Sequence, residues 1–145
     1  MDLSKLQSTI LKKGYSIEEV EGFYALGKLY LETGNIHQAS SIFDGLVETF
    51  PDFFPALLAQ SVTSLIDSDY TEAIQSAQRV LDAEPQLIEG LLLLVIGMLR
   101  TENYNSAGTY LGEVRELLES GSIKEENLIR LYKMLLAQYK FRSSV

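Results

Sequence analysis

Residues of the same kind recur along this chain at a fixed interval of 34 positions. Pro51 and Pro85 are one interval apart. Two further series repeat the interval twice: Ala39, Ala73 and Ala107, and Ile36, Tyr70 and Tyr104. A period of roughly 20 to 50 residues is typical of arrays in which each repeat stacks on its neighbours. No segment shows the alternation of a β-strand, so the period predicts an all-α solenoid.

The repeat occurs in three copies, over residues 20–53, 54–87 and 88–121. The first copy holds Phe23, Leu26-Gly27, Tyr30, Gly34-Asn35, Ala39, Phe43 and Pro51. The second copy is weaker in its first half, with Leu57, Gln60, Ser61 and Ser64, and stronger in its second, with Tyr70, Ala73, Ala77, Val80 and Pro85. The third copy holds Leu91, Leu94, Val95, Met98, Asn103-Tyr104, Ala107, Leu111 and Val114.

These residues resemble the landmarks of the tetratricopeptide family, whose period is about 34 residues of paired helices. The resemblance covers roughly residues 20–121 and implies three helix pairs stacked into a right-handed solenoid with a concave groove. The residue types agree with that packing. Small residues such as Gly27 and Ala39 suit the close approach of two paired helices, and large ones such as Phe43 fill the space between neighbouring pairs.

Polar residues and prolines mark where the helices begin and end. Asn35, Asp69 and Asn103 occupy equivalent places before the second helix of each copy, where a side chain can cap free backbone amides. Pro51 and Pro85 follow apolar helical runs and cannot continue them. The pattern therefore predicts a capped second helix in every copy and a turn at each proline.

The two ends of the chain predict capping helices, which an open solenoid needs. An apolar stripe of Leu3, Leu6, Ile10 and Leu11 predicts an N-terminal helix within residues 1–15. Gly14 ends it, and Ser16 with Glu19 forms a capping box for the next helix. Ser122 with Glu125 suggests another capping box before a helix over 123–142. We therefore expect a single domain over residues 1–145 with about eight helices.

Composition narrows the possible functions. A net charge of −8 disfavours a nucleic-acid partner, which requires clustered Lys and Arg. The chain has no cysteine, and its single histidine, His37, has no partner at metal-ligand spacing. Phosphate-binding, nucleophile-elbow and HExxH motifs are missing. We therefore expect no enzyme activity, no cofactor and no metal.

Membrane insertion is not expected either. The longest apolar run, residues 91–99, is far shorter than the roughly 20 residues that a spanning helix needs. The acidic start, Met1-Asp2, lacks the basic and apolar regions of a secretory signal. These features favour a cytoplasmic protein.

The family resemblance also implies which residues face the groove, because the first helix of each pair lines the concave side. The corresponding stripes are Glu21, Tyr24, Lys28, Leu31 and Glu32 in the first copy; Pro55, Leu58, Val62, Leu65 and Ile66 in the second; and Glu89, Leu92, Ile96, Leu99 and Arg100 in the third. The residues predicted to contact a partner are Tyr24, Lys28, Leu31, Leu58, Val62, Leu65, Leu92, Ile96, Leu99 and Arg100.

This register predicts an apolar groove with charges at its margins. Tetratricopeptide grooves that hold the free carboxylate of chaperone tails require inward-pointing Lys, Asn and Arg. Leu58, Val62, Leu92 and Ile96 stand there instead, which favours an extended apolar segment of a protein partner. The run LLLLVIGML within residues 91–99 is apolar all round and needs cover on every face. A terminal helix, a second copy of the chain or a client protein would each provide it.

The whole arrangement resembles a subgroup, the class II chaperones of bacterial type III secretion. Three copies flanked by one helix at each end, an acidic pI near 4.6 and no cysteine are shared features. The resemblance implies a cytoplasmic bacterial dimer that holds an apolar segment of a secreted protein until export. The alternative is a tetratricopeptide adaptor that docks permanently into a larger assembly.

Overall fold

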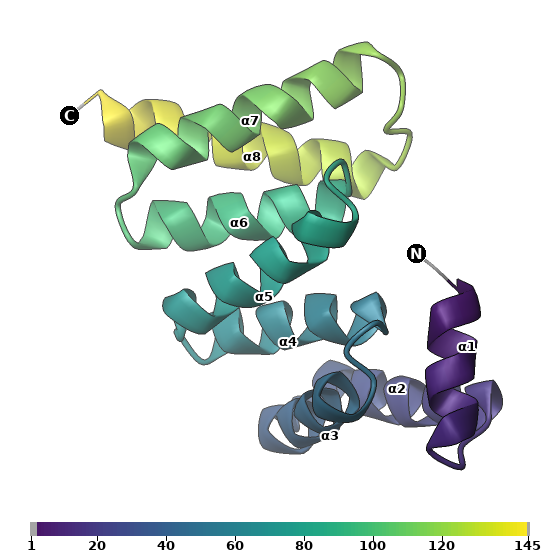
Figure 1. Ribbon diagram of the computed structural model, residues 1–145. Coiled ribbons are helices and arrows are strands. Elements are labelled where there is room, and N and C mark those ends of the chain that lie inside the picture. The colour runs from purple at the N-terminus through teal and green to yellow at the C-terminus, as the bar shows by residue number, and fades with distance from the viewer. Residues whose placement is uncertain (1–2, 145) are drawn as a thin grey trace.

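The computed structural model describes residues 3–144, which form eight α-helices and no strand. The helices are α1 (Leu3–Lys12), α2 (Ile17–Glu32), α3 (Ile36–Thr49), α4 (Phe54–Ile66), α5 (Tyr70–Ala83), α6 (Ile88–Arg100), α7 (Tyr104–Glu119) and α8 (Glu126–Ser143). Figure 1 shows α2 to α7 stacked as three hairpins, with α1 standing across the end beside α2 and α8 at the opposite end beside α7. The predicted all-α solenoid is confirmed.

A glycine sets the distance between the two helices of the first pair. A Cβ atom added to Gly27 on α2 would lie 2.6 Å from Cε1 of Phe43 and 3.1 Å from Cγ2 of Ile42, both on α3. Phe43 is fully buried by this approach. In the second pair Ser61 stands at the equivalent position, and its Oγ donates to the backbone oxygen of Ala73 at 2.8 Å. Gly27, which has no side chain, and Ser61, whose small hydroxyl has a hydrogen-bond partner, therefore both allow the two helices of their pair to pack closely.

The first helices of the three pairs end in the same way, one interval apart. Gly34, Ser68 and Glu102 have left-handed backbones, with φ of 83°, 61° and 60°. In each case the next amide donates to the carbonyl five residues back: Asn35 to Tyr30, Asp69 to Ser64 and Asn103 to Met98, all at 2.8 Å. This hydrogen bond is that of a Schellman helix end. The 34-residue period is thus visible in the backbone as well as in the side chains.

The predicted side-chain caps form at only two helices. The capping box of α2 is present, with Ser16 and Glu19 bonding each other's backbone amides. At α5 the carboxylate of Asp69 accepts from the amide of Glu72 at 3.2 Å. Asn35 and Asn103 make no side-chain cap, although their backbones match that of Asp69. Asn35 instead donates its amide to the Thr33 hydroxyl at 2.9 Å.

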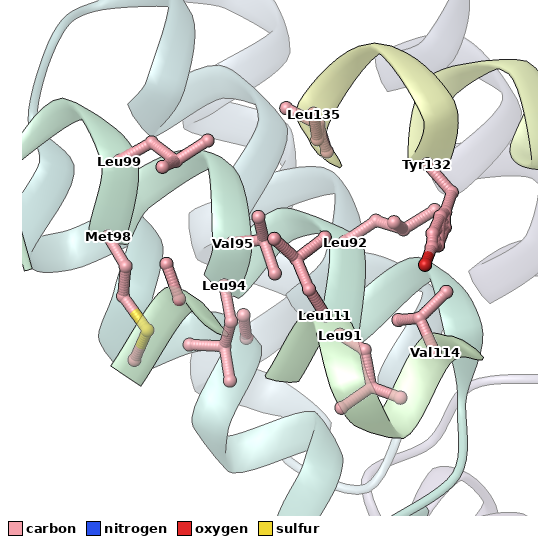
Figure 2. Packing of buried hydrophobic residues seen from close by; sticks show 12 residues of the cluster. Leu91, Leu92, Leu94, Val95, Met98, Leu99, Leu111, Val114, Tyr132 and Leu135 are labelled. Atoms are coloured by element: carbon pink, nitrogen blue, oxygen red, sulfur yellow. The ribbon is translucent and has the colours of Figure 1, made fainter. Parts of the chain in front are cut away.

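The apolar helix α6 is the centre of the core, and its cover comes from the chain itself. Figure 2 shows side chains from α6, α7 and α8 converging on one cluster. Its members are Ala77, Leu91, Leu92, Leu94, Val95, Met98, Leu99, Ala107, Leu111, Val114, Tyr132 and Leu135. On α6, Ile88, Leu93 and Ile96 are the large apolar side chains that stay partly exposed. Of the three possible covers for the apolar run at residues 91–99, the chain's own helices therefore provide most of the cover.

The terminal helices are anchored differently. Leu6 and Ile10 of α1 are buried against the first repeat, as predicted, but Leu11 is 77% exposed. The helix is also tied by an ion pair between Lys5 and Asp52, at 3.6 Å. The last helix, α8, begins at Glu126, and Glu125 precedes it without a side-chain cap. The capping box predicted at residues 122–125 does not form, because α8 begins four residues after Ser122. The Ser122 hydroxyl pairs with that of Ser120 at 2.7 Å.

The Gly27 contact can be tested against a matched glycine. Gly27→Ala should lower the free energy of unfolding by about 1 to 3 kcal/mol, because the new methyl group overpacks the Phe43 ring. Gly45→Ala on α3 is the control, since a Cβ there meets no atom within 4 Å. It should raise stability by up to about 1 kcal/mol through helix propensity. Urea unfolding followed by circular dichroism measures both, and equal effects would contradict the assignment.

The repeated left-handed positions give the opposite kind of test. Ser68→Gly and Glu102→Gly should each stabilise the chain by up to about 1 kcal/mol, because a side chain at positive φ costs roughly that much. Gly34→Ala should destabilise it by a similar amount for the same reason. Thermal unfolding of the three variants decides the matter. A loss of stability in both glycine variants would mean that these side chains do more than occupy a turn.

Candidate functional site

An apolar hollow of about 320 Å³ lies on the side of the solenoid formed by the first helices. Four helices contribute to it: α2, α4, α6 and, at one end, α8. The lining residues are Tyr24, Lys28, Leu31, Leu58, Ala59, Val62, Glu89, Leu92, Leu93, Ile96, Leu128 and Leu131. We call these residues the groove. Its volume is at the lower end of the roughly 300 to 1,000 Å³ of small-ligand pockets, which suits a few apolar side chains.

Of the charged and flanking residues in the three predicted stripes, Glu89 lines the groove, whereas Glu21, Glu32, Pro55 and Ile66 do not. Most of the residues predicted to contact a partner are found together in the groove. They are Tyr24, Lys28, Leu31, Leu58, Val62, Leu92 and Ile96. Three others are not. Leu65 is half-buried beyond the hollow, Leu99 is 3% exposed within the core, and Arg100 is exposed at the end of α6.

The register departs from prediction at α6 because α8 packs beside that helix. Leu92 and Leu99 share one buried cluster with Tyr132 and Leu135 of α8. Leu92 is 1% exposed, so it forms the floor of the groove and offers little surface to a partner. Removing it as Leu92→Ala would cost about 2 to 5 kcal/mol of folding free energy. Half-exposed residues such as Leu58 and Ile96 are therefore better probes of binding.

The end wall of the groove escaped the repeat-based prediction. Leu128 and Leu131 of α8 form this wall. Ala59 and Leu93 also line the groove and were not predicted to do so. The two leucines belong to an apolar face of α8 that is visible in the sequence. The repeat pattern does not predict where that face packs, because α8 lies outside the three copies. A terminal helix thus closes one end of the groove without filling it.

Two charges of opposite sign stand among the apolar walls. Among the described lining residues, Lys28 is the basic one and Glu89 the acidic one. The Lys28 ammonium lies 5.5 Å from the centre of the Tyr24 ring, in cation–π range. Glu89 is in the first turn of α6, where the helix dipole favours a negative charge. The groove therefore has a positive side on α2 and a negative side on α6.

Tyr24 is held in place by two further aromatic rings. The centre of its ring lies 6.0 Å from that of Phe43 and 5.5 Å from that of Phe53, the second in an edge-to-face arrangement. Burial raises the pKa of the Tyr24 phenol above its ordinary value. The hydroxyl therefore keeps its proton at neutral pH and can donate a hydrogen bond at the edge of the apolar surface.

A polar chain on the other side of α4 fixes how this helix presents Leu58 and Val62. Gln60 donates its amide to Asp44 of α3 at 2.8 Å and accepts from the Ser76 hydroxyl of α5 at 2.9 Å. No buried side-chain polar atom in the described part lacks a partner. The unusual residues of the second copy therefore replace the usual aromatic packing with hydrogen bonds, and the apolar stripe of α4 still faces the groove.

A hollow of about 430 Å³ between α7 and α8 is lined by Gly108, Gly112, Tyr139 and Lys140, among others. A Cβ on Gly108 would come within 2.6 Å of the Tyr139 hydroxyl, so this hollow belongs to the packing of the two helices. Residues 3–144 contain no cluster of three metal-binding side chains. None of their helices is long and apolar enough to cross a membrane.

Solved structures with this arrangement of helices are tetratricopeptide domains. The TPR2B domain of yeast Sti1, in a complex with pHsp70, superposes with a TM-score of 0.70 at 14% identity, over 83% of this chain and 98% of that one. The C-terminal TPR-containing domain of a Plasmodium falciparum protein described as an FK506-binding protein gives 0.69 at 13% identity, over 88% and 93%. MamA from RS-1, as the ArsTM double mutant, gives 0.64 at 15% identity, over 89% and 80%.

The chain therefore has the tetratricopeptide fold. At 13 to 15% identity these likenesses establish the architecture and leave the partner open. No family model matches the chain, and neither does any curated protein.

Proposed function

We propose that this chain is a non-catalytic, protein-binding module whose groove holds an extended apolar segment of a partner. The observation that carries the proposal is the line of half-exposed apolar side chains across α2, α4 and α6, which the chain's own packing leaves uncovered. Exposed apolar surface of this kind marks interaction sites. The fold supports the proposal, because tetratricopeptide arrays present their first helices as a concave binding surface.

The groove favours apolar anchors over a terminal carboxylate. A carboxylate needs several charge-assisted donors converging on it. Lys28 is the one basic side chain among the described lining residues, and Arg100 lies outside the hollow. Side chains such as leucine or phenylalanine, which gain about 1.5 to 3 kcal/mol each on full burial, fit this surface better.

Within this class we propose a class II chaperone of bacterial type III secretion. The supporting features are three repeats with one helix before and one after, an acidic chain and an apolar groove. In this role the protein works in the bacterial cytoplasm. It covers apolar anchors of a secreted client, which prevents the client from aggregating or inserting early into a membrane. Lys28 and Glu89 orient the client from opposite walls.

The second candidate is an adaptor that docks permanently into a larger assembly. It is favoured by apolar residues outside the groove, at the two ends of the solenoid. Leu29 on α2 is 54% exposed, and Met134 and Phe141 on α8 are 53% and 75% exposed. A permanent subunit has such surfaces covered by neighbouring subunits, whereas a client segment held in the groove leaves them exposed.

Peptide binding tests the groove directly. Fluorescent 12-residue peptides with leucine or phenylalanine at every third position, each made with a free and with an amidated carboxyl end, are titrated and followed by anisotropy. Leu58→Glu and Ile96→Glu should each weaken binding by about tenfold or more, equal to roughly 1.4 kcal/mol. Amidation should make no difference.

The matched control for the peptide experiment is Ile66→Glu. Ile66 is on α4 like Leu58 and is 52% exposed, but it does not line the groove. This variant should bind as the wild type does, and all three variants should keep their helical circular dichroism. Binding that survives Leu58→Glu, or that needs a free carboxylate, would contradict the assigned surface.

Affinity capture separates the chaperone from the adaptor. The wild type, Ile96→Glu and Ile66→Glu are each used as bait in cells of the source organism, and the captured proteins are identified by mass spectrometry. A chaperone should recover a membrane-active secreted protein with the wild type and Ile66→Glu and lose it with Ile96→Glu. A fixed-stoichiometry set of cytosolic or apparatus subunits, recovered by all three, would favour the adaptor.

A further inference from the structure

The outer faces of the two end helices of the solenoid carry matching apolar stripes. On α2, Gly22, Leu26 and Leu29 follow the four-then-three spacing that places residues on one face of a helix, and all three are exposed. On α8, Met134, Ala137 and Phe141 follow a three-then-four spacing and are exposed as well, and the basic Arg130 lies one turn before Met134. We call the first stripe the N-end face and the second the C-end face.

Within residues 3–144, neither face is covered by another helix. Helix α2 packs against α1, α3 and α4, and α8 packs against α6 and α7. Val20 and Gly27, the buried residues of α2, lie on the side of the helix away from Leu26 and Leu29. Tyr132 and Leu135, the buried residues of α8, lie on the side away from Met134 and Phe141. Figure 1 shows α2 and α8 toward opposite ends of the stack.

The charges of the two helices are opposite. Helix α2 carries four glutamates and one lysine, a net charge of −3. Helix α8 carries four basic residues and one glutamate, a net charge of +3 in a chain whose total is −8. Glu18 borders the N-end face, and Lys133 and Lys140 border the C-end face. None of these three forms an ion pair with another described residue.

We propose that the C-end face of one copy binds the N-end face of another, so that copies associate head to tail. Two N-end faces together would bring Glu18 of one copy toward Glu18 of the other, and two C-end faces would bring lysines toward lysines, whereas the mixed pair brings Lys133 and Lys140 toward Glu18. Gly22 presents no side chain on the N-end face, and the chain's own packing does not require a glycine there, since a Cβ would meet no atom within 4 Å. The groove lies on neither face, so it stays open along the assembly.

The consequence is an open association. A head-to-tail assembly keeps one free N-end face and one free C-end face at its two ends, so growth continues beyond two copies unless a ring closes. The contact depends on exposed charges and is therefore screened by salt. This inference is independent of the groove, since its residues and the groove residues do not overlap.

The decisive experiment mixes two variants that are each blocked at one end. Leu26→Glu spoils the N-end face and Phe141→Glu spoils the C-end face, at residues 40% and 75% exposed, so both should fold. Molar mass is measured by light scattering on a sizing column over a range of concentrations. The wild type should grow beyond two copies, each variant alone should remain a monomer, and their mixture should form a one-to-one dimer.

Two controls complete the experiment. Ile66→Glu changes a similarly exposed apolar residue at neither end and should associate like the wild type. Raising the NaCl concentration from about 0.05 to 0.5 M should weaken wild-type association by about tenfold, because the Debye length shortens over this range. In the charge-reversed variant Lys133→Glu/Lys140→Glu, association should also weaken.

Several results would overturn the proposal. A wild type that stays monomeric at every concentration would do so. Dimers formed by Leu26→Glu alone or by Phe141→Glu alone would show a symmetric contact or another surface. A mixture that stays monomeric would also count against it. Binding of monomeric wild type to vesicles of anionic lipid, lost in Phe141→Glu, would assign the basic C-end face to a membrane instead.

Discussion

The burial of α6 is the constraint on which the rest of the molecule depends. This helix is apolar on every side, so it must be surrounded, and α5, α7 and α8 do so while α4 lies along its remaining side. Because α8 takes one flank, Leu92 and Leu99 become core. Leu93 and Ile96 remain partly exposed, and together with Glu89 and the buried Leu92 they form the α6 side of the groove. The groove is thus formed largely by apolar side chains that the core does not fully bury.

The sequence predicts the helix pairs better than it predicts the groove residues and the helix caps. The helix pairs follow from the 34-residue interval, because small residues such as Gly27 and helix ends such as Gly34 are strictly local requirements. Tyr24, Lys28, Leu31, Leu58 and Val62 line the groove as the same register predicts, whereas Leu65 of α4 was predicted for the groove and lies beyond it. The third repeat departs from it because burial of Leu99 depends on α8, whose position the interval does not encode. Capping was overpredicted for a related reason: Asn35 has the right chemistry and place but finds a nearer partner in Thr33.

The weak second repeat illustrates how a fold tolerates departures from its pattern. Its first helix lacks the aromatic and glycine landmarks, yet α4 keeps its orientation through Asp44, Gln60 and Ser76, three side chains from three helices. Ser61 fills the place of a glycine and satisfies its own hydroxyl. A network of fully satisfied hydrogen bonds can fix the arrangement of helices, as close packing of apolar side chains does. The apolar side chains of α4 that line the groove therefore keep their place without the usual landmarks.

The opposite charges of the groove walls make it a directional site. Lys28 stands on α2 and Glu89 on α6, with apolar side chains such as Val62 between them. An extended chain can lie across this surface in two senses, and its own charges and backbone dipoles meet different neighbours in each. Under the proposed function, two segments with the same apolar spacing but reversed flanking charges would therefore be distinct ligands, distinguished by the order of their residues as well as by their hydrophobicity.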